Sequence, residues 1–517
     1  MTPEAGAEDP ADVLVVGAGP SGLALALSAH DHGARVRVVE RRPERFRPSR
    51  ALILHPRALE GLRPLGVVDE LLARADTSPV VDLHLGARVV TARLDDVVLP
   101  GTAFPHPVLV RQAEAESVLD EALARRGVTV ERGTEFVGRV GHRAGLRRGG
   151  TSEEASFRCL AGCDGPASAV RATTGVPWRG GPYRQEILLA DLELDGLRPG
   201  RAHVVAAADG LVFLFPIGEH APWRLLATTR STPFETPFGQ PGPPVPDQEL
   251  RSVLDASGLP VQLVRTAWSS RVRLQHRVAD RFRQGDVFLV GDAAHAHSPA
   301  GGQGMNTGIL DALNLGWKLA GAVDPRAGGT AREALLDSYE LERRPVDRQV
   351  LALTHAMFWG EAGTGRLPRF VRGRLAPLGA PAASALLGRP RLTAAGLGVL
   401  AQFHVRYRRS PLSVTAGRVR GKPRAGDRLP DALVRCGAPA VRLHGLTAAP
   451  GFHVLLERSA PDLDAAALGP GVQVHRLEDR PGEGGTVVRP DGHVGLRAAR
   501  IDGGQVSAWL AAARGRP

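Results

Sequence analysis

Three short motifs of this chain contain residue types that could bind a cofactor with phosphate groups. The first is the segment Gly-Ala-Gly-Pro-Ser-Gly at residues 17–22. At this spacing Gly17 permits a tight turn, Gly19 lets the backbone approach a pyrophosphate, and Gly22 lets a helix pack closely. The N–H groups at the start of such a helix favour negative charge. The segment therefore predicts a phosphate-binding turn.

An acidic residue at a suitable distance supports this interpretation. Glu40 stands 18 positions after Gly22 (40 minus 22) and ends a second apolar run. A carboxylate at this place accepts hydrogen bonds from the ribose hydroxyls of a dinucleotide, which favours a ribose without a 2′-phosphate. The glycine motif and the acid together predict a dinucleotide site.

The other two motifs each follow an apolar run. Cys163–Arg171 reads Cys-Asp-Gly-Pro-Ala-Ser-Ala-Val-Arg, and residues 291–306 read Gly-Asp-Ala-Ala-His-Ala-His-Ser-Pro-Ala-Gly-Gly-Gln-Gly-Met-Asn. Asp292, His295 and His297 resemble a set of metal ligands. Because a glycine-rich turn follows them and their surroundings are apolar, a cofactor loop is the better interpretation, and we expect no metal.

The elements that must position these motifs follow an α/β pattern. Residues 12–16 and 35–39 are apolar runs with helical spacing between them at 23–32, which predicts a βαβ unit. Helical periodicity returns at 113–126, and 157–162 reads as another short strand. A parallel sheet with covering helices is therefore expected.

A second pattern interrupts the first. Between residues 80 and 98, and again between 188 and 230, apolar residues alternate with period two, which is typical of antiparallel strands. Six prolines between 233 and 246 disfavour regular structure, so this segment is expected to be a loop, of a kind that could cover a site. Long helices are expected at 306–319 and 331–358.

Composition excludes several classes of protein. The chain has 517 residues, 43% hydrophobic and 23% charged, as in folded proteins of three or four structural units. The formal charge of +11 reflects arginine, because Lys318 and Lys422 are the only lysines. Basic residues are spread beside acidic ones and aromatic residues make up only 4%, which disfavours nucleic-acid binding.

Neither a membrane protein nor a disulfide-linked protein is expected. No uncharged run reaches membrane-spanning length, and the acidic N-terminal residues do not resemble a signal peptide, so we expect a cytoplasmic protein. Cys159, Cys163 and Cys436 lack the partners of a zinc site and are expected to be packed, reduced thiols.

The three motifs, followed by Leu-Leu-Asp-Ser-Tyr-Glu-Leu-Glu-Arg-Arg-Pro at residues 335–345, closely resemble the class A flavoprotein monooxygenases, which are single-component FAD-dependent aromatic hydroxylases. The resemblance covers residues 12 to about 350. The segment 411–517, after a linker rich in Pro, Gly and Arg at 410–426, resembles the thioredoxin-like appendage of phenol hydroxylase and of the aromatic polyketide hydroxylases. No Cys-x-x-Cys occurs there, so packing or partner contact is its expected role.

This resemblance implies a fold and its boundaries. We expect an α/β protein whose Rossmann-like FAD-binding domain carries an inserted, mostly antiparallel substrate domain, with a thioredoxin-like α/β domain at the C-terminus. The expected FAD-binding parts are 1–79, 111–182 and 281–400, the substrate parts are 80–110 and 183–280, and the C-terminal domain is 411–517.

The resemblance also assigns residues to the cofactor. Asp292 is expected to hydrogen-bond the ribityl chain of FAD, and the backbone at Gly304–Asn306 is expected to face the flavin ring. Gln112 is expected to contact FAD, with Arg111 as the competing choice. Asp164 also suits the N-terminus of a short helix after Ser168, and both roles can coexist. The full set of expected cofactor residues is Gly17, Gly19, Pro20, Ser21, Gly22, Glu40, Arg41, Arg50, Arg111, Gln112, Asp164, Gly165, Gly291, Asp292, Pro299, Gly302, Gly304, Met305 and Asn306.

Residues with a role in the reaction are less well marked. His55, soon after Arg50, is a candidate beside the flavin together with Pro299, although His55 equally suits the start of a helix through Pro56. Phe213, Phe215 and Trp223 could line a substrate pocket, although aromatic residues in strands more often belong to the core.

The implied activity is hydroxylation of an aromatic compound, with a polyketide or polycyclic phenol as the expected substrate. NADPH or NADH reduces FAD, and O2 forms a flavin C4a-hydroperoxide that transfers oxygen. Alternatives that the motifs leave open are Baeyer–Villiger oxygenation or epoxidation of a polyketide, and a flavin-binding scaffold without activity. The expected partners are the small aromatic substrate and O2, with neither nucleic acid nor membrane, and a homodimer is possible.

Overall fold

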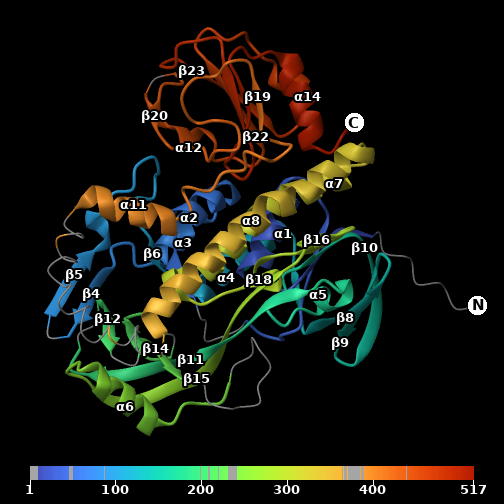
Figure 1. Cartoon of the computed structure of the whole chain (residues 1–517). Coiled ribbons are helices and arrows are strands. Elements are labelled where there is room, and N and C mark those ends of the chain that lie inside the picture. The colour runs from blue at the N-terminus through green and yellow to red at the C-terminus, as the bar shows by residue number, and fades with distance from the viewer. Residues whose placement is uncertain are drawn as a thin grey trace, which may run out of the picture.

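The structure is a computed structural model. It describes residues 10–45, 51–86, 88–197, 200–207, 210–218, 220–230, 242–363, 389–437 and 439–517, together with residues 365, 370 and 385. Figure 1 shows three regions, with the C-terminal unit on one side of the long helix α8 (Gly329–Ala362) and the two larger sheets on the other side.

A mostly parallel sheet forms the first region. Its order is β16-β17-β10-β1-β2-β7, and β8 and β9 extend it as an antiparallel meander from the first half of β10. β1, β2, β7, β10 and β17 are parallel. The strands are β1 (Ala11–Val16), β2 (Val36–Glu40), β7 (Val130–Arg132), β8 (Thr134–Val140), β9 (Arg143–Arg148), β10 (Thr151–Gly162), β16 (Arg283–Gln284) and β17 (Val287–Leu289). The continuous apolar run of β1 is explained by its central place, where both faces are covered.

Helices cover this sheet and meet at small residues. α1 (Pro20–Asp31) packs against α7 (Gln303–Val323), and a Cβ on Gly308 or Gly316 would overlap Ser21 or Ser28. The other helices before α7 are α2 (Pro56–Leu62), α3 (Val68–Ala73), α4 (Gln112–Arg125), α5 (Ala169–Thr174) and α6 (Asp247–Ser257), with 3-10 turns at Arg63–Leu65, Leu94–Asp96, Gly291–Ala293 and Ala300–Gly302. β3 (Ile53–Leu54) and β6 (Val108–Leu109) form a separate, antiparallel two-stranded sheet.

The second sheet is mostly antiparallel. Its order is β18-β15-β11-β14-β13-β12-β4-β5, and only β12 and β4 run parallel among these described strands. The strands are β4 (Val80–Leu85), β5 (Arg88–Arg93), β11 (Trp178–Asp195), β12 (Ala202–Ala207), β13 (Gly210–Phe215), β14 (Trp223–Arg230), β15 (Gln262–Ala279) and β18 (His295–Ala296). β11 and β15 pair along nearly their whole length. One face packs on α6, and the other faces α8 (Gly329–Ala362).

The C-terminal unit is a smaller mixed sheet. Its strands run in the order β19-β25-β24-β22-β23, and β20 pairs with β21 beside them. They are β19 (Val414–Ala416), β20 (Leu433–Val434), β21 (Val441–Arg442), β22 (Phe452–Glu457), β23 (Val472–Leu477), β24 (Gly485–Val488) and β25 (Val494–Ala498). The helices after α8 are α11 (Pro390–Leu400), α12 (Leu443–Leu446), α13 (Ala465–Leu468) and α14 (Gly503–Ala513).

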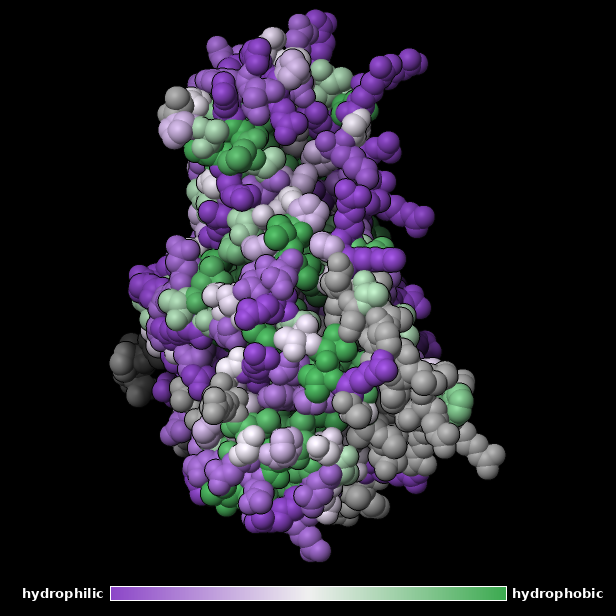
Figure 2. All heavy atoms as spheres, turned by 90° about the vertical axis from the view of Figure 1, so that its left-hand side faces the viewer, coloured by the Kyte–Doolittle hydropathy of each residue, from purple (hydrophilic) through white to green (hydrophobic). Residues whose placement is uncertain are grey.

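The described helices do not include a membrane span, and the face drawn in Figure 2 has its hydrophobic residues in separate patches. No helix in the described part of the chain combines the length and the apolar character that a membrane span requires. Hydrophilic residues cover much of the face in Figure 2, where hydrophobic residues form separate patches. Cys159, Cys163 and Cys436 are free thiols, and the first two are buried.

The structure corrects three details of the expected elements. α7 begins at Gln303, three residues before the expected start, because Gly302 adopts a left-handed conformation (φ 63°) and ends the preceding turn. The supposed linker contains β19, which pairs with β25. α6 within the second sheet was not expected. Residues 231–241 of the proline-rich segment lie outside the described residues, and 242–246 are irregular.

Candidate active site

A cavity of about 610 Å³ lies between the two larger sheets. One wall is formed by the three motifs at the ends of β1, β10 and β17, and the other by β11, β13, β14, β15 and the end of α8. Because the carboxyl ends of parallel strands meet at one edge of a sheet, motifs that are far apart in the sequence converge there.

The glycine turn after β1 forms an open cradle at one end of the cavity. Gly17 has a φ of 103°, and a Cβ on Gly22 would lie 1.9 Å from the Gly17 carbonyl oxygen. Gly19 lines the cavity, and a Cβ there would meet nothing within 4 Å. Gly17 and Gly22 are therefore required by the fold itself, whereas Gly19 leaves space for a ligand.

Charged residues surround this end of the cavity. Glu40 lines the cavity while its carboxylate accepts hydrogen bonds from the backbone N–H groups of Ala18 (2.9 Å) and Arg42 (3.0 Å). Arg41, Arg42 and Glu116 line it too, and the last two were missed because they belong to no motif. Burial raises the pKa of Glu116 to about 7.

The structure separates the two candidates at the start of α4. Gln112 lines the cavity and its amide joins the Ala51 N–H and the Glu116 carboxylate. The Arg111 guanidinium instead donates to Glu114 (3.1 Å) and to the Gly218 carbonyl. Arg50 lies outside the described residues.

Asp164 and Gly165 line the cavity at the end of β10. One Asp164 oxygen accepts from the Val170 N–H (3.0 Å) at the start of α5, where Ser168 is the N-cap, and the other oxygen is buried without a protein partner. Burial raises the pKa of Asp164. The helix-capping interpretation is thus compatible with a free acceptor at the cavity.

The third motif places Asp292 at the cavity, on a turn that is held by a carboxylate of α7. Asp292 is exposed and lines the cavity. Asp311 of α7 accepts hydrogen bonds from the Gly291 N–H (3.2 Å) and from His295 Nε2 (2.7 Å), so one buried carboxylate holds both sides of the turn. Although burial opposes protonation of His295, the carboxylates of Asp347 and Asp311 raise its pKa to about 9.

The grouping of His295, Asp311 and Asp347 resembles a metal site in composition. However, the Arg343 guanidinium donates to Asp311 (2.6 Å) and to Asp347 (3.2 Å), so an arginine cation already balances the carboxylates. The group is therefore an ion-pair network rather than a metal site. His297 does not belong to this group and lines the cavity instead.

The loop before α7 continues the wall. Pro299, Gly302, Gly304 and Met305 line the cavity. Asn306 lies just beneath, where its side chain accepts from the His55 N–H (2.7 Å) and donates to the Ile53 and Gly302 carbonyls.

His55 is placed differently from the expectation of a residue beside the flavin. It is the N-cap residue of α2, as the alternative interpretation expected, and its ring is buried. Nε2 donates to the Gly301 carbonyl (2.8 Å), and burial lowers its pKa to about 4. His55 thus supports the loop rather than facing the cavity.

The wall formed by the second sheet is apolar and aromatic. The parallel rings of Phe213 and Phe215 lie 6.1 Å apart and both line the cavity. Trp223 instead lies in the core on the α6 side of the sheet, which corrects its expected place. Sequence reasoning missed Met357, Phe358 and Glu361 because they lie at the end of α8, outside every motif.

The residues present fit a dinucleotide with a flavin. An open glycine cradle, unpaired acceptor capacity at Asp164, an exposed Asp292 and a helix that begins at the cavity are what the phosphates, ribityl chain and ring of FAD require.

Comparison with known proteins agrees with this geometry. Residues 10–354 match the family described as FAD binding domain. The chain is 39% identical to 6-methylpretetramide 4-monooxygenase of Streptomyces rimosus over 365 residues, which are 68% of this chain and 62% of that protein. It is 32% identical over 508 residues to a flavin-dependent monooxygenase of Mycobacteroides abscessus, covering 94% and 96% of the two chains.

A solved structure extends the likeness to the whole chain. The anhydrotetracycline hydroxylase OxyS of Streptomyces rimosus superposes with a TM-score of 0.77 at 27% identity, covering 98% of this chain and all of that one. The match includes the C-terminal unit. The chain therefore belongs to the FAD-binding family of flavoprotein monooxygenases, the class A aromatic hydroxylases.

Proposed function

We propose that this protein hydroxylates a polycyclic aromatic phenol of the polyketide type, with NADPH or NADH as the electron donor and O2 as the oxygen source. The observation that supports this best is the cavity between the two larger sheets, of which one wall is the FAD cradle and the other wall is apolar and aromatic. Two of the relatives are named for substrates of this kind, 6-methylpretetramide and anhydrotetracycline.

The chain's own residues would bind and orient the cofactor. When bound, FAD supplies the redox chemistry that joins one oxygen atom of O2 to the substrate. Glu40 and Gln112 would hold its adenosine end, the turn at Gly19 its pyrophosphate, and Asp292 its ribityl hydroxyls. The N-terminus of α7 lies at the cavity, and its dipole favours negative charge on a reduced flavin ring.

The apolar wall would orient a flat substrate and exclude water. Phe213 and Phe215 present parallel rings, and Phe358 packs edge-on against Tyr183 with 4.8 Å between ring centres. Burial raises the pKa of Glu361 to about 7, so near neutral pH its carboxyl group is partly uncharged and can donate a hydrogen bond to an oxygen of the substrate. Holding the ring in a dry cavity favours productive oxygen transfer over release of hydrogen peroxide.

An NAD(P)H oxidation screen tests this proposal. The holoenzyme would be assayed with hydroxylated polycyclic aromatics and with their O-methylated counterparts, and products would be analysed by mass spectrometry and by alkaline hydrolysis. We expect substrate-stimulated NAD(P)H oxidation and a stable product heavier by one oxygen atom. A hydrolysable lactone would show that the reaction is Baeyer–Villiger oxygenation and not hydroxylation. NAD(P)H oxidation without oxygenated product across the panel would contradict both activities.

One further property follows from the proposal. A reductant of the NAD(P)H type supports action in the cytoplasm, where that cofactor is kept reduced. The assembly is open between a monomer and a homodimer, and light scattering of the purified holoenzyme distinguishes the two.

A further inference from the structure

The loop that precedes α7 is fastened by a residue from outside the matched FAD-binding region. Gln402, which follows α11, is buried at 3% exposure. Its amide nitrogen donates to Gln303 Oε1 (3.1 Å) and to Thr307 Oγ1 (2.9 Å), both in the first turns of α7. Gln303 in turn donates to the carbonyl oxygens of Leu400 (2.9 Å) and Gly301 (3.2 Å). Each of the two segments, Gly301–Gln303 and residues 400–402, thus donates a hydrogen bond to the other.

The backbone of Gln402 is held in an unfavourable conformation. Its φ is 60°, and among the described residues no other residue besides glycine has a positive φ. A residue with a Cβ adopts this region at a cost of about 1 kcal/mol or more, and persists there only when its surroundings require it. In this conformation the side-chain amide contacts Gln303 and Thr307 of α7.

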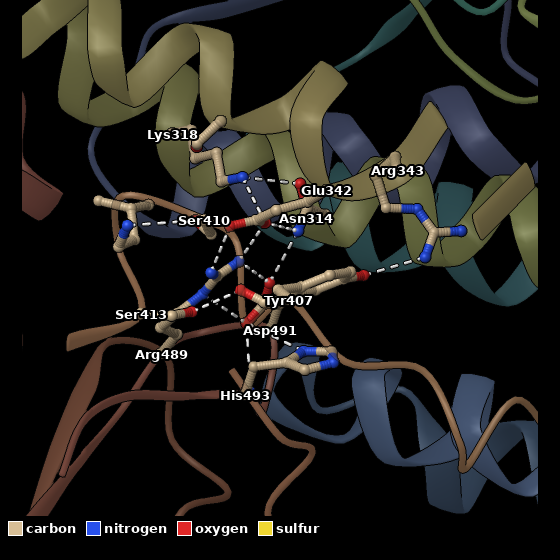
Figure 3. Close-up of polar contacts among 12 residues, drawn as sticks. Asn314, Lys318, Glu342, Arg343, Tyr407, Ser410, Ser413, Arg489, Asp491 and His493 are labelled. Atoms are coloured by element: carbon tan, nitrogen blue, oxygen red, sulfur yellow. Dashed lines mark hydrogen bonds and ion pairs between the residues drawn. The ribbon is translucent and has the colours of Figure 1, made fainter. Parts of the chain in front are cut away.

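A second connection reaches the Asp292 turn. The Arg343 guanidinium donates to the Tyr407 hydroxyl (3.0 Å) and to Asp311, the carboxylate that holds Gly291 and His295. Figure 3 shows Arg343 directed at Tyr407, which comes from the chain that leads into the C-terminal unit.

A buried ion-pair network holds this chain against α7 and α8. Arg489 of the C-terminal unit donates to both oxygens of Glu342 at 2.7 Å and also pairs with Asp491. Lys318 and Asn314 of α7 contact the same Glu342 carboxylate at 2.8 and 2.6 Å (Figure 3). Two cations and two carboxylates therefore balance in a site closed to solvent.

The buried charges of this network stabilise the structure only while they are paired. Removal of one member of a buried ion pair leaves an uncompensated charge, so the two regions remain docked as a unit. The two parallel hydrogen bonds from Arg489 to Glu342 also fix the orientation of the C-terminal unit relative to α8, because both bonds form only in one geometry. This gives the chain at Gln402 and Tyr407 a fixed position relative to α7.

We propose that Gln402 is a positioning residue of the flavin site, and that the C-terminal unit completes this site by holding Gln402 and Tyr407 against the loop before α7 and the Asp292 turn. The proposal concerns the binding of FAD and holds whichever substrate the enzyme accepts. It gives the C-terminal unit a role that needs neither a thiol nor a second protein.

Release of FAD from the holoenzyme tests the proposal, followed as the rise in flavin fluorescence after dilution. The main variant is Gln402→Gly, because glycine accepts the left-handed backbone and the substitution removes only the amide and its side chain. We expect FAD release about tenfold faster than in the wild type, as for the loss of buried hydrogen bonds. Tyr407→Phe should accelerate release about threefold, since Arg343 keeps its two carboxylate partners.

Ser410→Ala is the matched control. The Ser410 hydroxyl donates to the same Glu342 carboxylate and accepts from the Leu412 N–H, so its hydrogen bonds are made to neither the loop nor the Asp292 turn. We expect a lower unfolding temperature with an FAD release rate within twofold of the wild type. The positioning role would be overturned if Gln402→Gly released FAD at the wild-type rate. It would also be overturned if Gln402→Gly and Ser410→Ala accelerated FAD release equally.

Gln402→Asn keeps the proposal testable if the glycine variant fails to fold. Asparagine also tolerates the left-handed region and retains an amide, but its shorter side chain cannot reach both Gln303 and Thr307. Release between the wild-type rate and tenfold faster is expected. A rate equal to that of the wild type would again contradict the proposal.

Discussion

Asp292 presents its carboxylate to the cavity from the turn after β17, while Asp311 holds that turn from the opposite side. Binding and folding are therefore assigned to different residues. Asp292→Ala should yield a folded protein that is largely free of flavin, because it removes the acceptor for the ribityl hydroxyls and leaves the Asp311 contacts in place. Flavin titration and calorimetry of the apoprotein measure the two effects. Near-normal FAD affinity with reduced thermal stability of the apoprotein would show that Asp292 only stabilises the turn.

His55 acts on the loop through the Gly301 carbonyl. We therefore expect His55→Ala to lower the amount of product formed per NAD(P)H consumed, while flavin reduction continues, because a displaced loop orients the ring less well. Steady-state NAD(P)H consumption together with product quantification measures this coupling. Unchanged coupling would remove His55 from the site, and loss of all turnover with normal flavin reduction would show that the site needs an acid or a base here.

At the scale of the element, Gly19 and Gly22 at the start of α1 have different roles. A Cβ at Gly22 would lie 1.9 Å from the Gly17 carbonyl oxygen, whereas a Cβ at Gly19 would meet nothing within 4 Å. Gly22→Ala should destabilise the apoprotein by about 2 kcal/mol or more, because α1 must move away from β1. Gly19→Ala should leave apoprotein stability unchanged and weaken FAD binding, because the new methyl group occupies the pyrophosphate cradle. Unfolding of the two apoproteins and FAD titrations separate the two effects. Equal loss of stability in both variants would contradict this division.

At the scale of the whole molecule, the contact between the C-terminal unit and the FAD-binding region should be sensitive to acid. His493 is buried beside Asp491, and its Nδ1 lies 3.3 Å from the Arg57 guanidinium of α2. Burial lowers its pKa from 6.5 to about 4. The unfolded chain thus binds a proton on His493 at a higher pH than the folded chain, so this residue reduces stability as the pH falls from about 6.5 to about 4.

Comparison with His493→Gln isolates this effect from that of other groups. Between pH 7 and pH 4 the stability of the wild type relative to the variant should fall by on the order of 3 kcal/mol, since the glutamine has no proton to gain. Denaturant unfolding at saturating FAD and a series of pH values measures the difference. A difference that does not change with pH would show that His493 is accessible to protons in the folded protein.

Much of the site could be predicted because it is encoded locally. The glycine turn, Glu40, and the motifs with Asp164 and Asp292 each combine a strand end with a fixed spacing, and a strand end fixes where the next few residues lie. Gly17, Gly19, Glu40, Asp164 and Asp292 all line the cavity. The two sheets were predicted as well, because period-two alternation and apolar runs reflect burial on one face or on both.

Other features depended on packing between segments that are distant in the sequence. Trp223 and Phe213 both lie in strands of the same sheet, but only the tertiary structure decides which face of that sheet meets the cavity. His55 and Gln402 lie outside the motifs, and each contacts the third motif, at Gly301 and at Gln303, from a distant chain position. Glu361 likewise reaches the cavity from the end of α8. Gln402 reaches the start of α7 across about 100 residues, and no local pattern records such a contact. The sequence by itself determined the cofactor and the strand ends that present it, since both depend on short-range geometry. Only the tertiary structure decided what supports them, since that support consists of side chains brought together by folding.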